Sequence, residues 1–265
     1  MIKKALILIF AVLLIFPLFH AVCLSLFSPS DFYSTPARFF PSALHFENYK
    51  AIFDSYSLLR PLINTIAVAM VTGALRILII LPASYAISNM NFRFRKAISA
   101  ILIIPMLIPQ DVVLHSNYKI IAALGLLDTL QGISCACIYS ASSFIIIHLS
   151  LSSVPEELIG AAKIDGAEDC MILIKIIVPL IRNTIALIFI QAFLNQFNSY
   201  LWPLVVSSSE ESRMLQIAIN QLGFIEDGNM GAVFASISFI FILSLFLILS
   251  MRKRIFSATE DSLLF

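Results

Sequence analysis

Charged residues are scarce in this chain of 265 residues, where Asp, Glu, Lys and Arg together make up 12% of the sequence and hydrophobic residues 60%. A soluble domain usually carries about 25% charged residues to cover its surface. The mean hydropathy of +0.96 agrees with that shortage of charge. The composition therefore predicts a membrane protein, and no region resembles a soluble enzyme domain in its composition.

Other features are also missing. Lys plus Arg number 17 and Asp plus Glu 16, so the net charge of +1 gives no basic excess for binding nucleic acid. The four cysteines (Cys23, Cys135, Cys137 and Cys170) lack the paired spacing of a zinc site and are too few for a disulfide scaffold. No G-x-x-x-x-G-K-[ST] loop occurs. We therefore expect no metal site, and no ATP or other cofactor bound by this chain itself.

Long apolar runs are plentiful instead, and a helix of about 20 apolar residues can cross a bilayer. Six such runs are bounded by charged or polar segments: 5–27, 61–88, 97–114, 132–149, 176–206 and 230–251. The third contains Pro105 and Pro109. The first could instead be a signal peptide, but it is longer than a typical signal core and no cleavage site follows it. We expect residues 1–265 to form one all-α domain of six transmembrane helices.

The positive-inside rule predicts the orientation, because Lys and Arg concentrate in cytoplasmic loops. With the N-terminus inside, eleven of these cations are cytoplasmic, five are external and one lies within a span. The eleven are Lys3, Lys4, Arg93, Arg95, Lys96, Lys163, Lys175, Arg182, Arg252, Lys253 and Arg254. Both termini are then cytoplasmic, 28–60 is an external loop and 151–175 is a cytoplasmic loop.

The cytoplasmic loop is polar and too short to fold alone, so we expect it to dock on another surface. Residues 153–156 read Ser-Val-Pro-Glu, which fits a capping box and predicts a short helix from that point. Residues 165–168 read Asp-Gly-Ala-Glu, so we expect a break at Gly166 and a second helix, capped by Asp165, that leads to Pro179.

Small residues at Gly160, Ala161 and Ala162 would let another protein approach the backbone of the first helix closely. Leu158 and Ile159 would add apolar contacts beside them. The alternative is that this helix lies against the spans of the chain itself.

Residues 155–167, P-E-E-L-I-G-A-A-K-I-D-G-A, followed by I-V-P-L at 177–180, resemble the signature loop of binding-protein-dependent ABC importer permeases. That loop reads E-A-A-x-x-D-G-A, and here Gly160 stands where glutamate is usual. The resemblance implies a coupling helix seated in a cleft of an ATP-binding subunit. The coupling residues would be Glu156, Glu157, Gly160, Ala161, Ala162, Asp165, Gly166 and Ala167.

Further segments are similar to the carbohydrate-uptake branch of this family, which includes glycerol-3-phosphate and maltose-type permeases. They are Phe40-Pro41, F-E-N-Y at 46–49, Asn64, Ser84-Tyr85-Ala86, Phe92-Arg93 and N-S-Y-L-W-P-L at 198–204. The resemblance implies a type I importer permease in the bacterial inner membrane. Its partners would be a second homologous permease, two ATP-binding subunits that hold ATP and Mg, an extracytoplasmic solute-binding protein and the surrounding lipid.

Arg76 lies near the middle of the second apolar run, where a cation must face protein or water rather than lipid. Some glycerol-3-phosphate-type permeases carry a cation at the matching place, which implies an anionic substrate. Two interpretations stay open at this point. Arg76 either forms an ion pair with Asp111 or contacts the substrate.

Polar and aromatic residues near the outer ends of other spans are further candidates for the translocation path. They are Asn117, Asn195, Asn198, Tyr200 and Trp202. Amides and aromatic rings could bind a hydroxyl-rich substrate. The alternatives are hydrogen bonds between helices for the amides and an interfacial aromatic belt for Tyr200 and Trp202.

The predicted function is transport of a sugar or a glycerol-3-phosphate-like polyol phosphate by a permease subunit that is not itself an enzyme. One alternative is a secondary transporter or channel without an ATPase, which leaves the capped loop unexplained. Another is a membrane enzyme, because Asp165-Gly166 resembles the start of the D-G-x-x-A-R motif of lipid alcohol phosphotransferases. Residues 168–170, Glu-Asp-Cys, interrupt that motif.

Overall fold

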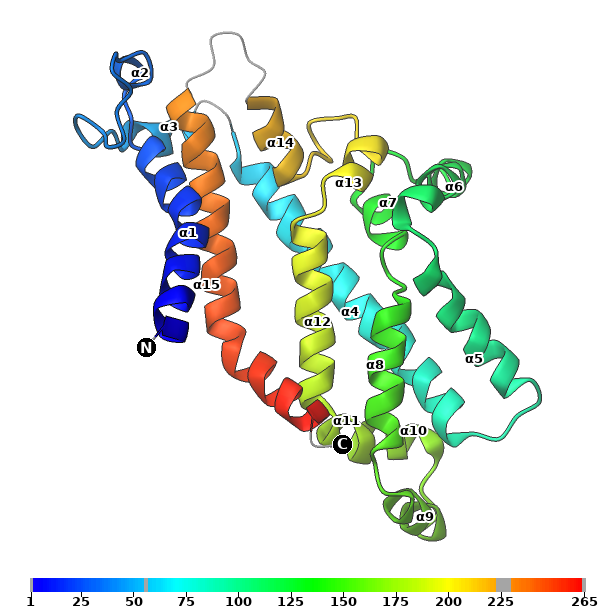
Figure 1. Cartoon of the computed structure of the whole chain (residues 1–265). Helices are drawn as coiled ribbons and strands as arrows, with labels where there is room; N and C mark the ends of the chain where they lie inside the picture. Colours follow the sequence, from blue (N-terminus) through cyan, green and yellow to red (C-terminus); the bar gives the residue numbers. More distant parts are fainter. Residues whose placement is uncertain (1, 55–56, 223–229, 264–265) are drawn as a thin grey trace. The chain divides into compact units, whose positions relative to one another are not determined.

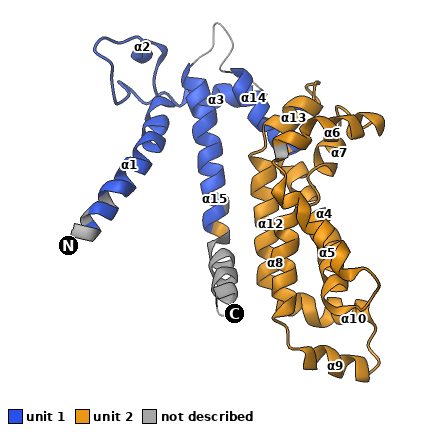
Figure 2. Cartoon of the chain, turned by 45° about the vertical axis from the view of Figure 1, so that its right-hand side comes forward, with its two compact units in different colours: residues 1–64, 213–249 blue, residues 65–212, 250–265 orange. Residues whose placement is uncertain are grey.

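A computed structural model describes residues 2–54, 57–222 and 230–263, and every regular element among them is a helix. The all-α prediction is confirmed for these residues. The chain divides into two compact units, drawn in two colours in Figure 2. One unit comprises 1–64 and 213–249, the other 65–212 and 250–265.

The first unit joins the N-terminal segment to residues 213–249. Its helices are α1 (Ile2–Leu24), α2 (Pro29–Phe32), α3 (Glu47–Asp54), the first turn and a half of α4 (Leu59–Asn89), α14 (Leu215–Leu222) and most of α15 (Met230–Leu263). Two aromatic pairs connect the segment after α1 with α15: Phe32 stacks on Phe234 and Phe53 meets Phe239 edge to face.

The F-E-N-Y segment has a structural role in this unit. The Asn48 side-chain amide donates to the carbonyls of Ser25 and Phe27, 2.9 Å each, at the end of α1. The Tyr49 and Ser25 hydroxyls are 2.8 Å apart. A Cβ at Gly231 would come within 2.4 Å of the Asn48 amide nitrogen, so a glycine is needed there. These contacts hold α3 against the end of α1.

A capping box begins α2, between the Ser28 hydroxyl and the Asp31 carboxylate. Asp31 also accepts from the backbone N–H of Ser42 and lies 3.7 Å from the Arg38 guanidinium. Hydrogen bonds from Ser42 and Ser28 favour the charged carboxylate and lower the pKa of Asp31 to about 2. The ionised side chain thus fixes the fold of this loop.

The second unit contains the remaining helices. They are the rest of α4, α5 (Arg95–Ile103), η1 (Ile104–Leu107), α6 (Gln110–Ala123), α7 (Leu130–Cys135), α8 (Ala141–Ser152), α9 (Glu156–Ile164), α10 (Asp169–Ile172), η2 (Leu173–Ile177), α11 (Val178–Leu180), α12 (Arg182–Phe197) and α13 (Leu201–Val206). Helix α8 packs against both α5 and α12, and α9 lies beyond the end of α8 (Figure 1).

Proline interrupts several of these helices. The pair Arg95–Leu107 and Asp111–Ala123 bends by 111° around Pro109, and α9 leaves α8 at 73° after Pro155. A bend of 82° follows Pro179, between Asp169–Leu180 and α12. Proline lacks the N–H for the helical hydrogen bond, and its ring clashes with the preceding turn.

Helix length and composition limit which described segments can cross a membrane. Leu59–Asn89 and Met230–Ser250 are each long and apolar enough, and counting each bent pair as one span gives up to five. Ile9–Leu24 is a shorter apolar helix. The predicted run at 132–149 falls on α7 and α8 with a break between them, and the run at 176–206 extends from η2 to α13 with breaks after α11 and α12.

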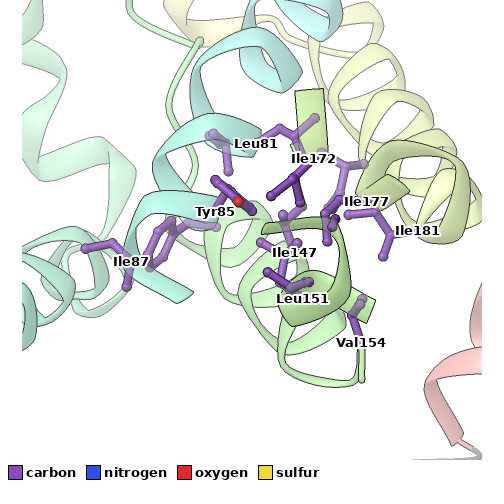
Figure 3. Packing of buried hydrophobic residues seen from close by; sticks show 14 residues of the cluster. Leu81, Tyr85, Ile87, Ile147, Leu151, Val154, Ile172, Ile177 and Ile181 are labelled. Atoms are coloured by element: carbon purple, nitrogen blue, oxygen red, sulfur yellow. The ribbon is translucent and has the colours of Figure 1, made fainter. Parts of the chain in front are cut away.

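The core of the second unit lies where α4, α8 and α12 meet the segment from α9 to α11 (Figure 3). Its buried members come from all of these elements: Ile80, Leu81, Tyr85, Ile87, Phe144, Ile147, Leu151, Val154, Ile159, Ala162, Ile172, Ile177, Ile181 and Ile188. The polar loop at 151–175 therefore shares one apolar core with three of the long helices.

Candidate functional site

Helix α9 forms where the sequence predicts it, but the predicted capping box is wrong. Pro155 precedes the helix, and no side chain caps its first N–H groups. The Ser153 hydroxyl instead donates to the carbonyl of Ser150, 2.8 Å away. The reason is that α8 runs to Ser152, so Ser153 keeps a helical conformation (φ −86°, ψ −8°) and ends α8, whereas an N-cap residue needs an extended backbone.

The end of α9 is a Schellman motif, which the sequence analysis did not predict. Gly166 has φ +80°, and its N–H donates to Lys163 while the N–H of Ala167 donates to Ala162. The predicted break at Gly166 is confirmed. Asp165, however, ends α9 rather than capping the next helix, and Glu168 precedes α10 without a side-chain cap.

The two faces of α9 differ sharply in burial. Ile159 and Ala162 are 7% and 9% exposed and belong to the shared core. The remaining surface of the helix is its outer face, on which Ile164 is 88% exposed, while Leu158, at the edge of the buried face, is 45% exposed. Glu156, Glu157, Gly160, Ala161, Lys163, Asp165 and Gly166 are exposed as well, and Ala167 is partly buried against the core. The outer face therefore combines two large apolar side chains with small and charged ones.

Gly160 lies on that outer face, and outside its own helix backbone and chain neighbours no described heavy atom lies within 4 Å of the place a Cβ would occupy. Its φ is not in the left-handed region that favours glycine. Neither the backbone conformation nor the packing within the chain requires a glycine at this position.

Asp169 connects the loop to α4, a contact for which the sequence analysis had no signal beyond an acidic residue at a helix start. Its Oδ1 accepts a hydrogen bond of 2.9 Å from the Tyr85 hydroxyl. The same oxygen lies 3.6 Å from Lys163 Nζ, at the end of α9. Tyr85 belongs to the Ser-Tyr-Ala segment near the end of α4.

Arg76 is 6% exposed, and its guanidinium donates to backbone carbonyls. Nε lies 3.1 Å from the carbonyl oxygen of Ile138 and Nη2 lies 2.5 Å from that of Cys137. The predicted ion pair with Asp111 is wrong, because Asp111 is exposed in the first turn of α6 and no ion pair joins it to Arg76 in the described part of the chain. Carbonyls just past the end of α7 lack helical partners and take the cation instead.

The other path candidates are spread over several elements. Asn117 is half-buried in α6, Asn195 is exposed in α12, and Tyr200 is exposed before α13. Asn198 is exposed, and its amide donates to the carbonyl of Leu194 in its own helix, 2.9 Å away. Trp202 is buried, and its indole N–H donates to Ile133 in α7 over 3.1 Å. The structure thus gives Trp202 a packing role between helices.

A second carboxylate that the sequence analysis missed fixes the segment after α13. Oδ1 of Asp128 accepts from the N–H groups of Ser208 and Ser209, at 2.8 and 2.9 Å, and from the Ser212 hydroxyl at 2.5 Å. These bonds favour the charged carboxylate and hold the pKa of Asp128 well below its usual range. The backbone N–H of Asp128 also donates to the carbonyl of Val206, 2.8 Å away, at the end of α13.

Comparison with known proteins shows to which family this arrangement belongs. Residues 78–255 match the family described as "Binding-protein-dependent transport system inner membrane component". The sn-glycerol-3-phosphate transport system permease protein UgpE of Rhizobium meliloti (strain 1021) is 30% identical over 215 residues, which cover 78% of this chain and 76% of that protein. The lactose transport system permease protein LacG of Rhizobium radiobacter is 28% identical over 190 residues, 71% and 69% of the two chains.

A solved structure shows the same fold. It is the crystal structure of a bacterial ABC transporter involved in the import of the acidic polysaccharide alginate, with a TM-score of 0.84 and 23% sequence identity. The match covers 96% of this chain and 94% of that one. The fold is thus that of a type I ABC importer permease.

The family resemblance predicted from the loop at 155–180 is confirmed. The relatives are permease subunits of sugar and glycerol-3-phosphate transporters rather than enzymes, and ATP hydrolysis lies on separate subunits, which excludes the phosphotransferase alternative. This chain belongs to the family of inner-membrane components of binding-protein-dependent transport systems.

Proposed function

We propose that this chain is the membrane-spanning permease subunit of an ATP-driven importer, and that the outer face of α9 docks on a separate ATP-binding subunit. The observation that carries the proposal is the exposure of Leu158 and Ile164 on a short helix whose opposite face is buried. In the part of the chain that the structure describes, Leu158 and Ile164 remain 45% and 88% exposed. Because these apolar side chains lie in a polar loop outside the spans, a protein partner rather than lipid would bury them.

The energetics of the outer face support docking. Burying an exposed isoleucine or leucine side chain fully is worth about 1.5–3 kcal/mol. The small residues Gly160 and Ala161 let a partner approach the helix backbone closely, so the apolar side chains beside them can enter a cleft. The inner face joins the helix to the shared core and the Schellman motif at Gly166 joins it to α10, so a displacement of the helix can reach both.

The proposed assembly follows from the family. It contains a second homologous permease, two ATP-binding subunits that hold ATP and Mg, and an extracytoplasmic solute-binding protein. We propose six spans in the bacterial inner membrane with both termini cytoplasmic, supported by the excess of Lys and Arg on that side. The span that contains α8 would end where α9 turns away after Pro155.

The proposed substrate is a sugar or a glycerol-3-phosphate-like polyol phosphate. Its support is the named cargo of the relatives, glycerol 3-phosphate for UgpE and lactose for LacG. Asn195, Asn198 and Tyr200 remain path candidates because they are exposed in this chain. Arg76 is a weaker candidate, since two of its donors already bind carbonyls.

The test is affinity co-purification of the chain from native membranes, with mass spectrometry of what stays bound. We expect a second permease and an ATP-binding subunit. Gly160→Trp should abolish that retention, because the indole would fill the space in which the partner approaches. Gly160→Ala is the matched control and should retain the partner. A chain that purifies alone after mild extraction would instead support a secondary transporter, which is the alternative.

A further inference from the structure

We propose that Tyr85 and Asp169 form a latch that makes α9 and the end of α4 move as one body. The proposal rests on the proposed function, because it assigns the route by which docking at α9 would reach the spans. It concerns two residues that belong neither to α9 itself nor to the predicted translocation path.

The first step is that α9 has little apolar area to hold it in place. Only Ile159 and Ala162 of this helix are buried in the core, at 7% and 9% exposure. Apolar contacts are non-directional, so two buried side chains do not by themselves fix the tilt of a helix. The helix is also joined to the rest of the chain by Pro155 at one end and by Gly166, with φ +80°, at the other.

The second step is that directional contacts supply what the apolar face lacks. Lys163 Nζ, at the end of α9, lies 3.6 Å from Asp169 Oδ1, at the start of α10. This pair spans the Schellman turn and ties the two helices together. A carboxylate at the first residue of a helix is also favoured by the N–H groups there.

The third step is that the same carboxylate oxygen reaches α4. The Tyr85 hydroxyl donates to Asp169 Oδ1 over 2.9 Å, while the Tyr85 ring is buried in the shared core. A phenol held by its ring fixes its hydroxyl in one place. The Tyr85 hydrogen bond therefore sets the register between α10 and α4. The backbone hydrogen bonds of the Schellman turn at Gly166 extend that register to α9, with a minor contribution from the Lys163 ion pair.

The two contacts are unequal, which makes the latch testable. Lys163 and Asp169 have side chains 46% and 41% exposed, and such pairs contribute little. The Tyr85 bond has one rigid, buried partner. We therefore assign the latch to the Tyr85 hydrogen bond and a minor part to Lys163.

The experiment measures the distance between spin labels on α9 and α4 by double electron–electron resonance spectroscopy. Ile164→Cys and Leu78→Cys place labels at positions that are 88% and 69% exposed. The four native cysteines are replaced by alanine or serine first, since Cys135 and Cys170 are exposed. The chain is measured alone in lipid nanodiscs, because residue 164 lies on the proposed docking face.

The latch predicts one narrow distance distribution for the parent chain. Tyr85→Phe and Asp169→Leu should raise the population of displaced α9 roughly two- to tenfold, the value of one hydrogen bond. Asp169→Asn should stay narrow, because its side-chain carbonyl still accepts from Tyr85. Lys163→Gln should also stay nearly unchanged.

Two results would overturn the latch. One is a Tyr85→Phe distribution as narrow as the parent's, and the other is a Lys163→Gln distribution as broad as that of Asp169→Leu. The measurement on the chain alone decides this without a partner. If no ATP-binding subunit co-purifies, the proposed function fails while the latch is still tested, so the two failures are distinguishable.

Discussion

Helix α9 and Arg76 lie in the same unit of the chain, and the fold treats them in opposite ways. Arg76 is a cation in an apolar helix, and two backbone carbonyls take its donors. Ile164 is a large apolar side chain in a polar loop, and it is 88% exposed. Contacts within the chain thus account for the burial of Arg76, whereas the described contacts do not account for an exposed isoleucine at position 164. The unexplained residue is the one that points to a partner.

The largest expected effect contrasts the two faces of α9. Ile159→Ala opens a cavity in the shared core and should lower the free energy of unfolding by about 2–5 kcal/mol. Ile164→Ala should change it by less than about 0.5 kcal/mol, yet weaken retention of the ATP-binding subunit. Chemical unfolding in detergent and co-purification measure the two quantities. Equal destabilisation by both variants would mean that Ile164 is part of the core.

The next effect concerns the buried cation. Arg76→Met leaves the carbonyls of Cys137 and Ile138 without their donor and should lower the free energy of unfolding by about 1–3 kcal/mol. Arg76→Lys should lose less, because an ammonium can donate to at least one of them, and transport should follow the same order. Asp111→Asn is the control and should have no effect. If Asp111→Asn lowered the free energy of unfolding as much as Arg76→Met, the result would support an ion pair between Arg76 and Asp111.

A smaller effect separates the two glycines of the loop. Gly166→Ala forces a Cβ into the left-handed region at φ +80° and should cost about 1–2 kcal/mol of unfolding free energy. Gly160→Ala lies inside a helix with open space around it and should gain about 0.5–1 kcal/mol. The same unfolding titration measures both. The Schellman geometry would be contradicted if Gly166→Ala were the stabilising variant.

The smallest effect is a dependence of stability on acid. The folded state lowers the pKa of Asp31 to about 2, below the ordinary value of about 3.9, so its contribution is present above pH 4 and is lost as the pH falls toward 2. Thermal unfolding in detergent across this range should show the loss, and Asp31→Asn should reduce it. Stability that rises as the pH falls toward 2 would have the wrong sign for a lowered pKa.

The sequence predicted the features that depend on local pattern. The shortage of charge and the long apolar runs predicted an all-α membrane protein. The loop at 151–180 predicted the family, a short helix through Glu157 to Lys163 and a break at Gly166. The capping box failed because the pattern at 153–156 does not reveal that α8 continues to Ser152. A local pattern indicates which residues can cap a helix, but it does not show whether such a residue ends the preceding helix or begins the next one.

Contacts between distant residues were out of reach. The partner of Arg76 is a pair of backbone carbonyls, which carry no sequence signal, so the search for an acidic partner led to Asp111. Asp169 accepts a hydrogen bond from a residue that is 84 positions away in the sequence. Asp128 accepts hydrogen bonds from residues that are 80 to 84 positions away. Only the packing of α4 against α10 and the fold of the segment after α13 bring those groups together.

The central claim is that the outer face of α9 docks on an ATP-binding subunit, and site-specific photo-cross-linking from residue 164 tests it most directly. A photoreactive phenylalanine replaces Ile164 in the chain expressed in native membranes, and mass spectrometry identifies the adduct. Position 78 on α4, also exposed in this chain, serves as the comparison. The account predicts an adduct with an ATP-binding subunit from position 164 and not from position 78. Cross-linking from position 164 to lipid alone, or the absence of any protein adduct from that position, would contradict it.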